Sequence, residues 1–348
     1  MILDEPTAVL APQEVDPLFK ALADLKKEGL AVVLITHKLD EIMRVADRVT
    51  VLRNGKRLAT ANVSDTNPKN LAQLMIGREI GYEYKKEKVD TTEIVLSVEG
   101  LRALDDRGAE SVRGASFSIR RGEIFGIAGV SGNGQRELTE AIMGLRPALA
   151  GKILLRNKNI TNLPPYEVPS LGVAYIPEER HRDGSIGEFS VADNLILKRQ
   201  RDPTISRNRF LLIPNQVDAV AKKMVADFDV RTPSVKTMAG SLSGGNLQRM
   251  ILARELSGKP DLVVAAQPTR GLDIAATDYV RRKLVDMRNA GAAVLLISED
   301  LDETLTLSDR VGVMYKGEFA GIASPHQVTV EDVGLMMTGM KRLETVAS

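Results

Sequence analysis

The chain has 348 residues, of which 43% are apolar and 27% are charged, as in an ordinary globular protein of one or two domains. Its formal net charge of +1 gives no general argument for binding nucleic acid or an anionic membrane. There is no cysteine, no basic signal-peptide region and no apolar run near the roughly 18–20 residues of a membrane span, so we expect a soluble cytosolic chain without disulfides.

The first predicted elements are a short strand, a helix and a second strand. The chain opens with "MILDEPTAVL", in which an apolar run precedes Asp4-Glu5 and Pro-Thr. Apolar residues then recur at helical spacing. "AVVLIT", residues 31–36, is a continuous β-branched run typical of a parallel strand buried on both faces. Strands alternating with helices predict an α/β fold with a parallel sheet.

This N-terminal segment is repeated 262 positions later. Without a gap over about 75 positions, "DEPT" falls on "AQPT", and Asp40-Glu41 falls on Asp302-Glu303. Further matches are Asp47-Arg48-Val49 on Asp309-Arg310-Val311, Gly55 on Gly317, Met75 on Met337 and Gly77 on Gly339. So long a period indicates duplicated domains rather than a solenoid.

The first copy starts at a point that corresponds to residue 263, about two thirds of the way along the second domain. We therefore predict that residues 1–77 are the C-terminal part of one domain and that residues 94–345 are a whole second one. The stretch between them, residues 78–93, is charged and lacks periodicity, which favours a short linker. The second domain opens with strand-like segments, "IVLSVEGLRAL" and "VRGASFSIRRGEIFGI".

A glycine-rich loop follows "EIFGIA" in the second domain. "GVSGNGQREL", residues 129–138, lies between a predicted strand and a helix, where backbone N–H groups can wrap a phosphate. Gly129, Gly132 and Gly134 match the phosphate-loop pattern, whereas Gln135 stands at its lysine position and Arg136 at its Ser/Thr position. The glycines that would surround a phosphate are kept, but the usual lysine and the metal-binding hydroxyl of Ser or Thr are absent. Taken alone, such a turn is equally consistent with a purely structural role.

"LSGGNLQRMILAREL", residues 242–256, is the more specific motif. Ser243, Gly244 and Gly245 at a helix start would direct a hydroxyl, free N–H groups and the positive end of the helix dipole at an anion. The alternative is an ordinary helix with a Ser-Gly-Gly entry turn.

Together these motifs resemble the ATP-binding cassette family over essentially the whole chain. The resemblance rests on "LSGGNLQR", on "PTRGLD" about 20 residues later and on the degenerate loop about 110 residues earlier. It is strongest to the twin-cassette ATPases of bacterial importers for simple sugars and nucleosides, with "AAQPTRGLD" and "IPEERHRDG" similar to the nucleoside branch. The implied fold is an α/β P-loop NTPase of the cassette type, with a mixed sheet flanked by helices and a helical subdomain around residues 164–214.

The resemblance implies roles for residues of the first copy. Asp4 matches the carboxylate that holds Mg²⁺, Glu5 the general base, and His37 in "LITHKLDE" the switch histidine that contacts the γ-phosphate. The structural alternatives are a pair of solvated charges opening a turn and an ordinary imidazole at a strand end.

The second copy departs from the pattern at each of these places. Ala266 and Gln267 replace the two acids, Glu299 replaces the histidine and Gln135 replaces the lysine. Gln can hydrogen-bond a water but cannot accept its proton, and a glutamate facing phosphate is electrostatically unfavourable. We expect this site, formed by Gly129, Gly132, Asn133, Gly134, Gln135, Arg136 and Gln267, to bind nucleotide weakly and not to hydrolyse it efficiently.

Cassettes of the family pair head to tail, so the resemblance implies that Asp4, Glu5 and His37 share a site with Ser243, Gly244 and Gly245. The implied cofactors are ATP and Mg²⁺. The implied partners are transmembrane permease subunits, indirectly an extracellular solute-binding protein, and a complete cassette or a second copy, but no nucleic acid. The implied location is cytoplasmic, peripheral on the inner face of the membrane. Because the first cassette is expected to be truncated, we expect little ATPase activity from this chain alone.

Two other functions remain open from the sequence. One is a soluble twin-cassette translation factor, which the short stretch 78–93 and the non-acidic Gln267 disfavour. The other is a non-hydrolysing regulatory or vestigial nucleotide-binding module.

Overall fold

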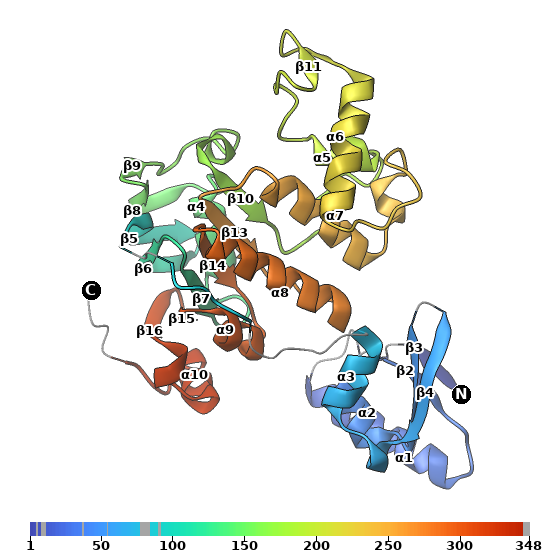
Figure 1. Cartoon of the computed structure of the whole chain (residues 1–348). Helices are drawn as coiled ribbons and strands as arrows, with labels where there is room; N and C mark the ends of the chain where they lie inside the picture. The colour runs from blue at the N-terminus through green and yellow to red at the C-terminus, as the bar shows by residue number, and fades with distance from the viewer. Residues whose placement is uncertain are drawn as a thin grey trace. The chain divides into compact units, whose positions relative to one another are not determined.

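A computed structural model of the chain describes residues 1–343 except 5, 8–11, 37, 54, 77–83 and 90–91 (Figure 1). The chain divides into two compact units. The first comprises Met1–Tyr82 with Gly271–Tyr279, and the second comprises Glu83–Arg270 with Val280–Ser348. The boundary between the units at 82/83 falls inside the predicted linker, 78–93.

The first unit is built on two small pairs of strands. Strand β1 (Ile2–Asp4) pairs in parallel with β2 (Val33–Ile35), and β3 (Arg48–Arg53) forms an antiparallel hairpin with β4 (Lys56–Asn62). The helices are α1 (Pro12–Lys27), α2 (Leu39–Val45), η1 (Val63–Asp65) and α3 (Pro68–Ile76). The predicted apolar face of α1 is confirmed, because Phe19 and Leu22 are buried.

The second unit contains a six-stranded mixed sheet in the order β10-β13-β14-β7-β15-β16. All neighbours are parallel except the last pair. The strands are β7 (Ile124–Ala128), β10 (Val173–Ile176), β13 (Leu262–Ala266), β14 (Ala293–Ile297), β15 (Arg310–Tyr315) and β16 (Glu318–Ala323). The mixed α/β sheet expected from the sequence is therefore present.

A second, antiparallel sheet of four strands belongs to the same unit, in the order β6-β5-β8-β9. Its strands are β5 (Ile94–Leu104), β6 (Glu110–Arg120), β8 (Ala148–Leu155) and β9 (Lys158–Asn159). Phe117 from this sheet stacks on Phe125 from the main sheet, with ring centroids 5.0 Å apart. The two sheets thus share one apolar core, which also contains Leu138 of the helix that follows β7.

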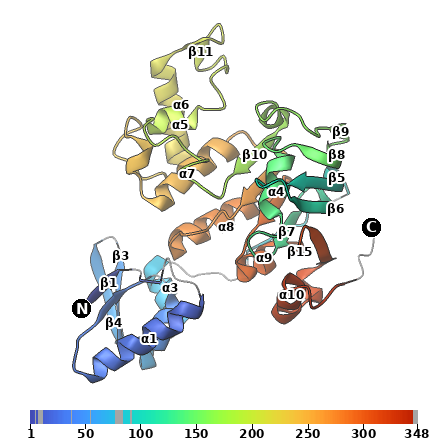
Figure 2. The same cartoon turned by 180° about the vertical axis from the view of Figure 1, so that it is seen from behind.

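Helices flank the main sheet, and others form a helical part that extends away from it (Figures 1 and 2). The flanking helices are α4 (Gln135–Ile142), α8 (Ile274–Asn289), α9 (Leu301–Leu307) and α10 (Val330–Met337). The helical part consists of α5 (Val191–Leu195), α6 (Pro214–Asp227) and α7 (Gly244–Leu256), with the small hairpin β11 (Ser206–Arg207) and β12 (Leu211–Leu212). It joins the main sheet through α7, where Glu255 accepts from the N–H of Tyr175 in β10 at 3.0 Å. This helical part extends well beyond the predicted range 164–214. Short η2 (Val168–Leu171), η3 (Ala239–Ser241) and η4 (Pro325–Gln327) complete the elements.

The sequence repeat is also a repeat of structure. Helix α1 corresponds to α8 and α2 to α9 with the same bounds after the shift of 262 positions. Strand register is conserved too: Asp4 pairs with Ile35 in the first copy, and Ala266 pairs with Ile297 in the second. Even the register shift of the hairpin falls at the same step, Val51/Leu52 in one copy and Val313/Met314 in the other.

Part of the predicted linker is packed against the second unit. The ammonium group of Lys86 donates to the carbonyl of Ser308 at 2.8 Å and pairs with Asp309 at 3.3 Å. The side chain of Asn289 donates to the carbonyl of Lys85 at 2.9 Å and accepts from the N–H of Glu87 at 3.0 Å. Residues 84–89 are therefore an ordered strap rather than a free connection. No helix among the described residues is both long and apolar enough to span a membrane.

Candidate functional site

The glycine-rich loop leaves the centre of the main sheet. Strand β7 is buried along its whole length between β14 and β15, and the loop after it leads into α4. Gly134 has φ +102°, and a Cβ there would lie 2.3 Å from the carbonyl oxygen of Ser111. Gly132 also has a left-handed φ of +85°. At Gly134 both backbone angle and space therefore require glycine.

The loop turns one of its own carbonyl groups inward. The oxygen of Val130 accepts hydrogen bonds from Asn133 Nδ2 at 2.9 Å and from Gln135 Nε2 at 3.2 Å. The first N–H groups of α4 lack intrahelical acceptors, as at any helix start, and carry the positive end of the helix dipole. This arrangement suits the binding of an anion such as a phosphate.

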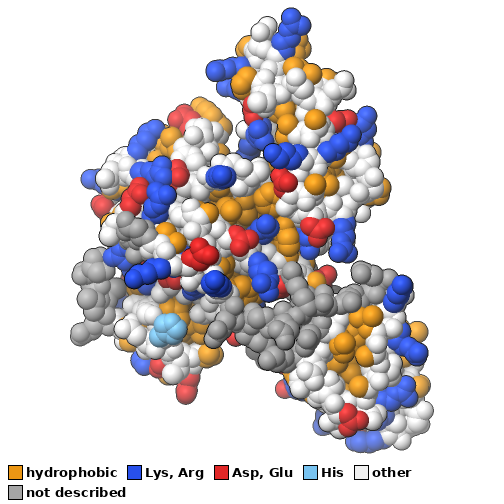
Figure 3. All heavy atoms as spheres, viewed as in Figure 1, with side chains coloured by type: hydrophobic (Ala, Val, Ile, Leu, Met, Phe, Trp, Pro, Cys, Tyr) orange, Lys and Arg blue, Asp and Glu red, His pale blue; other side chains and the backbone are white. Residues whose placement is uncertain are grey.

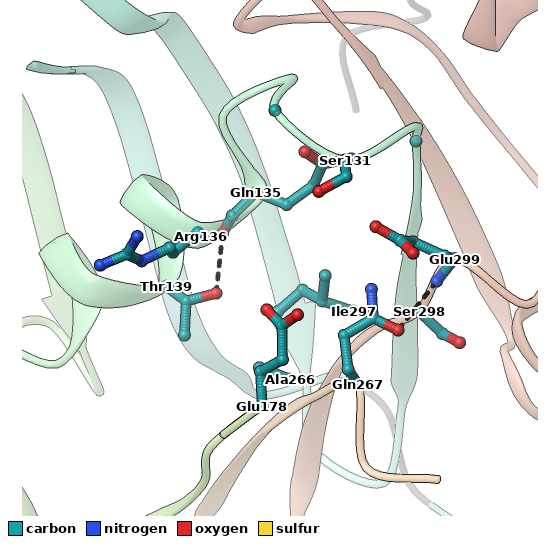
Figure 4. A pocket seen from close by; sticks show the side chains of 12 residues that line it. Ser131, Gln135, Arg136, Thr139, Glu178, Ala266, Gln267, Ile297, Ser298 and Glu299 are labelled. Atoms are coloured by element: carbon teal, nitrogen blue, oxygen red, sulfur yellow. Dashed lines mark hydrogen bonds between the residues drawn. The ribbon is translucent and has the colours of Figure 1, made fainter. Parts of the chain in front are cut away.

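A pocket of about 40 Å³ lies beneath the loop (Figure 4). Its lining joins the loop and α4 to residues at or just after the carboxyl ends of β10, β13 and β14. The lining residues are Gly129, Ser131, Gly132, Gln135, Arg136, Thr139, Glu178, Ala266, Gln267, Ile297, Ser298 and Glu299. The enclosed volume holds only a few waters. A nucleotide would therefore present only its phosphate end to this pocket.

Gln267 is held in an unusual conformation on the far side of the pocket from the loop. Its φ is +47°, which is uncommon for a residue other than glycine. Its N–H donates to the carbonyl of Ile297 at 2.8 Å, and its side-chain oxygen accepts from the N–H of Glu299 at 3.2 Å (Figure 4). The amide NH₂ of Gln267 can donate a hydrogen bond to a ligand. It is a donor, not a base.

The charges around the pocket are mostly acidic. Glu178 and Glu299 both line it, and Arg270 forms an ion pair with Glu178. Arg136, at the Ser/Thr position of the loop pattern, directs its guanidinium away from Gln267 (Figure 4). Arg136 donates to Glu140 at 2.8 Å and lies 3.4 Å from Asp106, and the Glu140 hydrogen bond raises the pKa of Arg136.

These residues fit the phosphates of ATP but not a catalytic metal. The glycine loop and the start of α4 supply the donors that a phosphate requires, and Gln267 adds another. Ala266 stands where a metal-binding acid would be needed, and no cluster of possible ligands for a metal ion occurs among the residues that the structure describes. The arrangement therefore offers hydrogen-bond donors to a phosphate and, at Gln267, an amide that cannot act as a base.

The second predicted motif lies outside this pocket. Ser243 is the N-cap residue of α7, and its Oγ accepts from the side chain of Asn246 at 3.0 Å. Further along, Gln248 Nε2 donates to the carbonyl of Pro268 at 2.8 Å, which ties α7 to the segment after β13. Ser243 itself is exposed, so the start of α7 faces solvent.

The predicted site residues thus fall into separate groups. Gly129, Gly132, Gln135, Arg136 and Gln267 line one pocket, Asn133 and Gly134 complete its loop, and Ser243, Gly244 and Gly245 lie apart at the start of α7. Asp4 is exposed at the end of β1. Glu5 and His37 lie outside the described residues.

Sequence reasoning missed five lining residues: Ser131, Thr139, Glu178, Ile297 and Ser298. Glu178 follows β10, and Thr139 lies one turn into α4. The signal for Glu178 was available, because the carboxyl ends of neighbouring parallel strands meet at one edge of a sheet.

Comparison with known proteins gives consistent results. The family model described as ABC transporter matches residues 112–270, which include both the glycine loop and the start of α7. The chain is 44% identical over 339 residues to the nucleoside import ATP-binding protein NupA of Lactococcus lactis, covering 97% of this chain and 67% of that protein. It is 44% identical to the guanosine import ATP-binding protein NupO of Bacillus subtilis, covering 99% of this chain and 67% of that protein.

A third relative is the glucose import ATP-binding protein TsgD13 of Haloferax volcanii, 46% identical, with 97% of this chain and 62% of that protein covered. The chain therefore spans about two thirds of the length of these relatives. Among solved structures, the ATP-binding cassette MJ1267 in its ADP conformation matches with a TM-score of 0.56 at 20% identity, covering 71% of this chain and 96% of that one. This likeness confirms the expected cassette fold.

Proposed function

The chain belongs to the ATP-binding cassette family of transporter ATP-binding proteins, and on this premise we propose that it is the energy-coupling subunit of an importer for nucleosides or simple sugars. The observation that carries the proposal is the glycine loop at the start of α4, placed opposite Gln267 in a pocket suited to phosphate. The substrate class follows the names of the relatives, which are import proteins for nucleosides, guanosine and glucose.

The two copies have different tasks in this proposal. The second copy binds ATP through the loop from Gly129 to Arg136 and through Gln267, and hydrolyses it poorly. The first copy supplies the hydrolytic residues, with Glu5 as general base and His37 at the γ-phosphate. Bound Mg²⁺, held at Asp4, would neutralise charge on the phosphates during hydrolysis.

The proposal requires partners. Residues 1–77 act as the C-terminal part of a first cassette, and Ser243, Gly244 and Gly245 close its nucleotide site from the second. ATP-driven closure of the two cassettes drives a pair of membrane permease subunits, to which a solute-binding protein outside the cell delivers the substrate. The chain is then a peripheral protein on the inner face of the membrane, and a complete cassette or a second copy is a further proposed partner.

The test is ATP hydrolysis by the purified chain in the presence of its permease subunits, as wild type and as Glu5→Gln. We expect Glu5→Gln to abolish hydrolysis because Gln cannot accept the proton of the attacking water. Hydrolysis unaffected by Glu5→Gln would show that the hydrolytic base lies elsewhere.

A second candidate function is a regulatory module that binds nucleotide without hydrolysis. The non-acidic residues Ala266 and Gln267, at the places that Asp4 and Glu5 occupy in the first copy, favour it. Recruitment by the permease separates the two functions: a transporter subunit forms a stable complex on membranes that contain its permease, and a separate regulatory module does not. The names of the relatives give no support to a translation factor.

A further inference from the structure

Asn133, in the middle of the glycine loop, holds two parts of the second unit together. Its side-chain oxygen accepts from the N–H of Lys316 at 2.7 Å, and its backbone oxygen accepts from the N–H of Gly317 at 3.0 Å. Its side-chain nitrogen donates to the inward-turned carbonyl of Val130 at 2.9 Å. One residue therefore fixes the shape of the loop and joins it to a turn 183 positions away.

That turn, Lys316–Gly317, connects β15 to β16 and is itself anchored on β6. The carbonyl of Gly317 accepts from the N–H of Arg113 at 2.8 Å. A Cβ on Gly317 would lie 2.4 Å from the carbonyl oxygen of Ser111, the same atom that a Cβ on Gly134 would approach to 2.3 Å. The loop and the turn thus converge on one backbone carbonyl of β6, with no room for a side chain at either place.

We propose that Asn133 and the Lys316–Gly317 turn form a brace that positions the glycine loop for phosphate binding. Nucleotide binding at the loop then stabilises the backbone of the turn. The proposal rests on the nucleotide binding proposed above and adds a structural element to that site. The turn touches no ligand in this account. It acts through Asn133, which is a positioning residue.

The brace matters for binding because the loop lacks the usual phosphate-binding lysine. A phosphate loop usually has a lysine whose charge draws the phosphates in, whereas here Gln135 is neutral and is hydrogen-bonded to Val130. Without that charge, affinity depends more on how well the N–H groups are aligned before the ligand arrives, because each disordered group must otherwise be immobilised on binding. Hydrogen bonds that fix the loop in advance reduce this cost.

The internal repeat supplies a matched control for the test. Gly55 is the counterpart of Gly317 in the hairpin β3–β4 and has a similar φ of +73°, but a Cβ there meets nothing within 4 Å. Gly55→Ala therefore introduces comparable backbone strain without disturbing the brace. Asn133 is not among the residues with positive φ, so Asn133→Ala removes its side-chain hydrogen bonds without backbone strain.

The experiment measures ATP affinity and amide hydrogen exchange of the full chain, as wild type and as the three variants. We expect Asn133→Ala to weaken ATP binding roughly tenfold, as the loss of two hydrogen bonds would, and Gly317→Ala to weaken it several-fold. We expect Gly55→Ala to leave the affinity within about twofold of the wild type. In the wild type, saturating ATP should slow exchange at the Lys316 and Gly317 amides, and in Asn133→Ala this response should disappear.

Each outcome bears on a different claim. Wild-type affinity in both Asn133→Ala and Gly317→Ala would overturn the brace and leave the proposed function intact. Equal losses in Gly317→Ala and Gly55→Ala would also overturn it, since strain alone would then explain the effect. If the wild type binds no ATP, the proposed function fails and the brace fails with it. A normal unfolding midpoint in Asn133→Ala excludes a merely unfolded variant.

Discussion

The two copies of the repeat have the same strand pairs and registers but differ in what surrounds them. Val33 in β2 is 54% exposed, whereas its counterpart Leu295 in β14 is fully buried. In the second copy, β7 lies between β14 and β15 in the sheet, and β10 pairs with the other side of β13. In the first copy, the described strands form two separate pairs. Local sequence therefore determines pairing and register, and neighbouring elements determine burial.

The same comparison holds for chemistry. At the ends of corresponding strands the first copy has Asp4 and the second has Ala266, on the same backbone register. The scaffold that would present a metal-binding acid is kept in the second copy, and the acid is not. A site can thus lose its chemistry while its geometry persists.

The largest expected difference between the copies is in the free energy of unfolding that is lost when the partner of an equivalent carboxylate, Glu303 or Glu41, is removed. Glu303 is fully buried and accepts from Arg281 Nε at 3.1 Å. Arg281→Met would leave this carboxylate uncompensated, and we expect a loss of about 3–5 kcal/mol in the free energy of unfolding. Glu41 is also buried, but it accepts from Thr7 Oγ1 at 2.7 Å in addition to pairing with the half-exposed Lys38 at 3.2 Å. Because Glu41 keeps this bond and Lys38 is partly screened by solvent, we expect Lys38→Met to cost less than about 1 kcal/mol. Urea unfolding of the two variants measures both values, and similar losses would contradict the comparison.

A smaller difference is expected for the equivalent isoleucines Ile297 and Ile35. Ile297 is 4% exposed and Ile35 is 50% exposed. We expect Ile297→Ala to destabilise the second unit by about 2–4 kcal/mol through lost burial and a cavity, and Ile35→Ala to cost about 1 kcal/mol or less. Hydrogen exchange of peptides covering β14 and β2 reports each unit separately. Equal costs would show that β2 is covered in solution.

The smallest expected difference is in how the stability of the equivalent helices α10 and α3 depends on pH. In α10, the carboxylate of Asp332 accepts from the N–H of Thr329 at 3.0 Å and pairs with Lys341 at 2.6 Å. The hydrogen bond from Lys341 and those from Thr329 lower the pKa of Asp332 to about 2 from its ordinary 3.8. In the corresponding helix α3, the neutral Asn70 stands at the place of Asp332, and its N–H donates to the side-chain oxygen of Asn67 at 2.9 Å.

Because the folded-state pKa of Asp332 is depressed, its contribution to stability is present above about pH 4 and is lost as the pH falls toward 2. We expect exchange protection of α10 to fall over this range and that of α3 to be unaffected by this group. Asp332→Asn should remove the dependence in α10. If α10 in that variant still loses protection between pH 4 and pH 2, another group is responsible.

The sequence predicted those features that depend on local pattern or on the repeat. The apolar run of residues 31–36 became β2, and the glycine spacing at 129–134 became a loop entering α4. The predicted burial of β2 on both faces is wrong, because Val33 and Ile35 are at least half exposed. The sequence did not predict the role of Glu178, the strap at 84–89 or the bonds of Asn133 to Lys316. These depend on contacts between segments far apart in the chain, for which no periodicity exists.

The central claim is that the second copy binds nucleotide without hydrolysing it, and the most direct test is to recover the nucleotide that the purified chain retains after incubation with radiolabelled ATP. We expect it to be recovered as ATP, and we expect Gly134→Ala to abolish retention because the new Cβ would meet the carbonyl of Ser111. Recovery as ADP, or retention unaffected by Gly134→Ala, would contradict the claim.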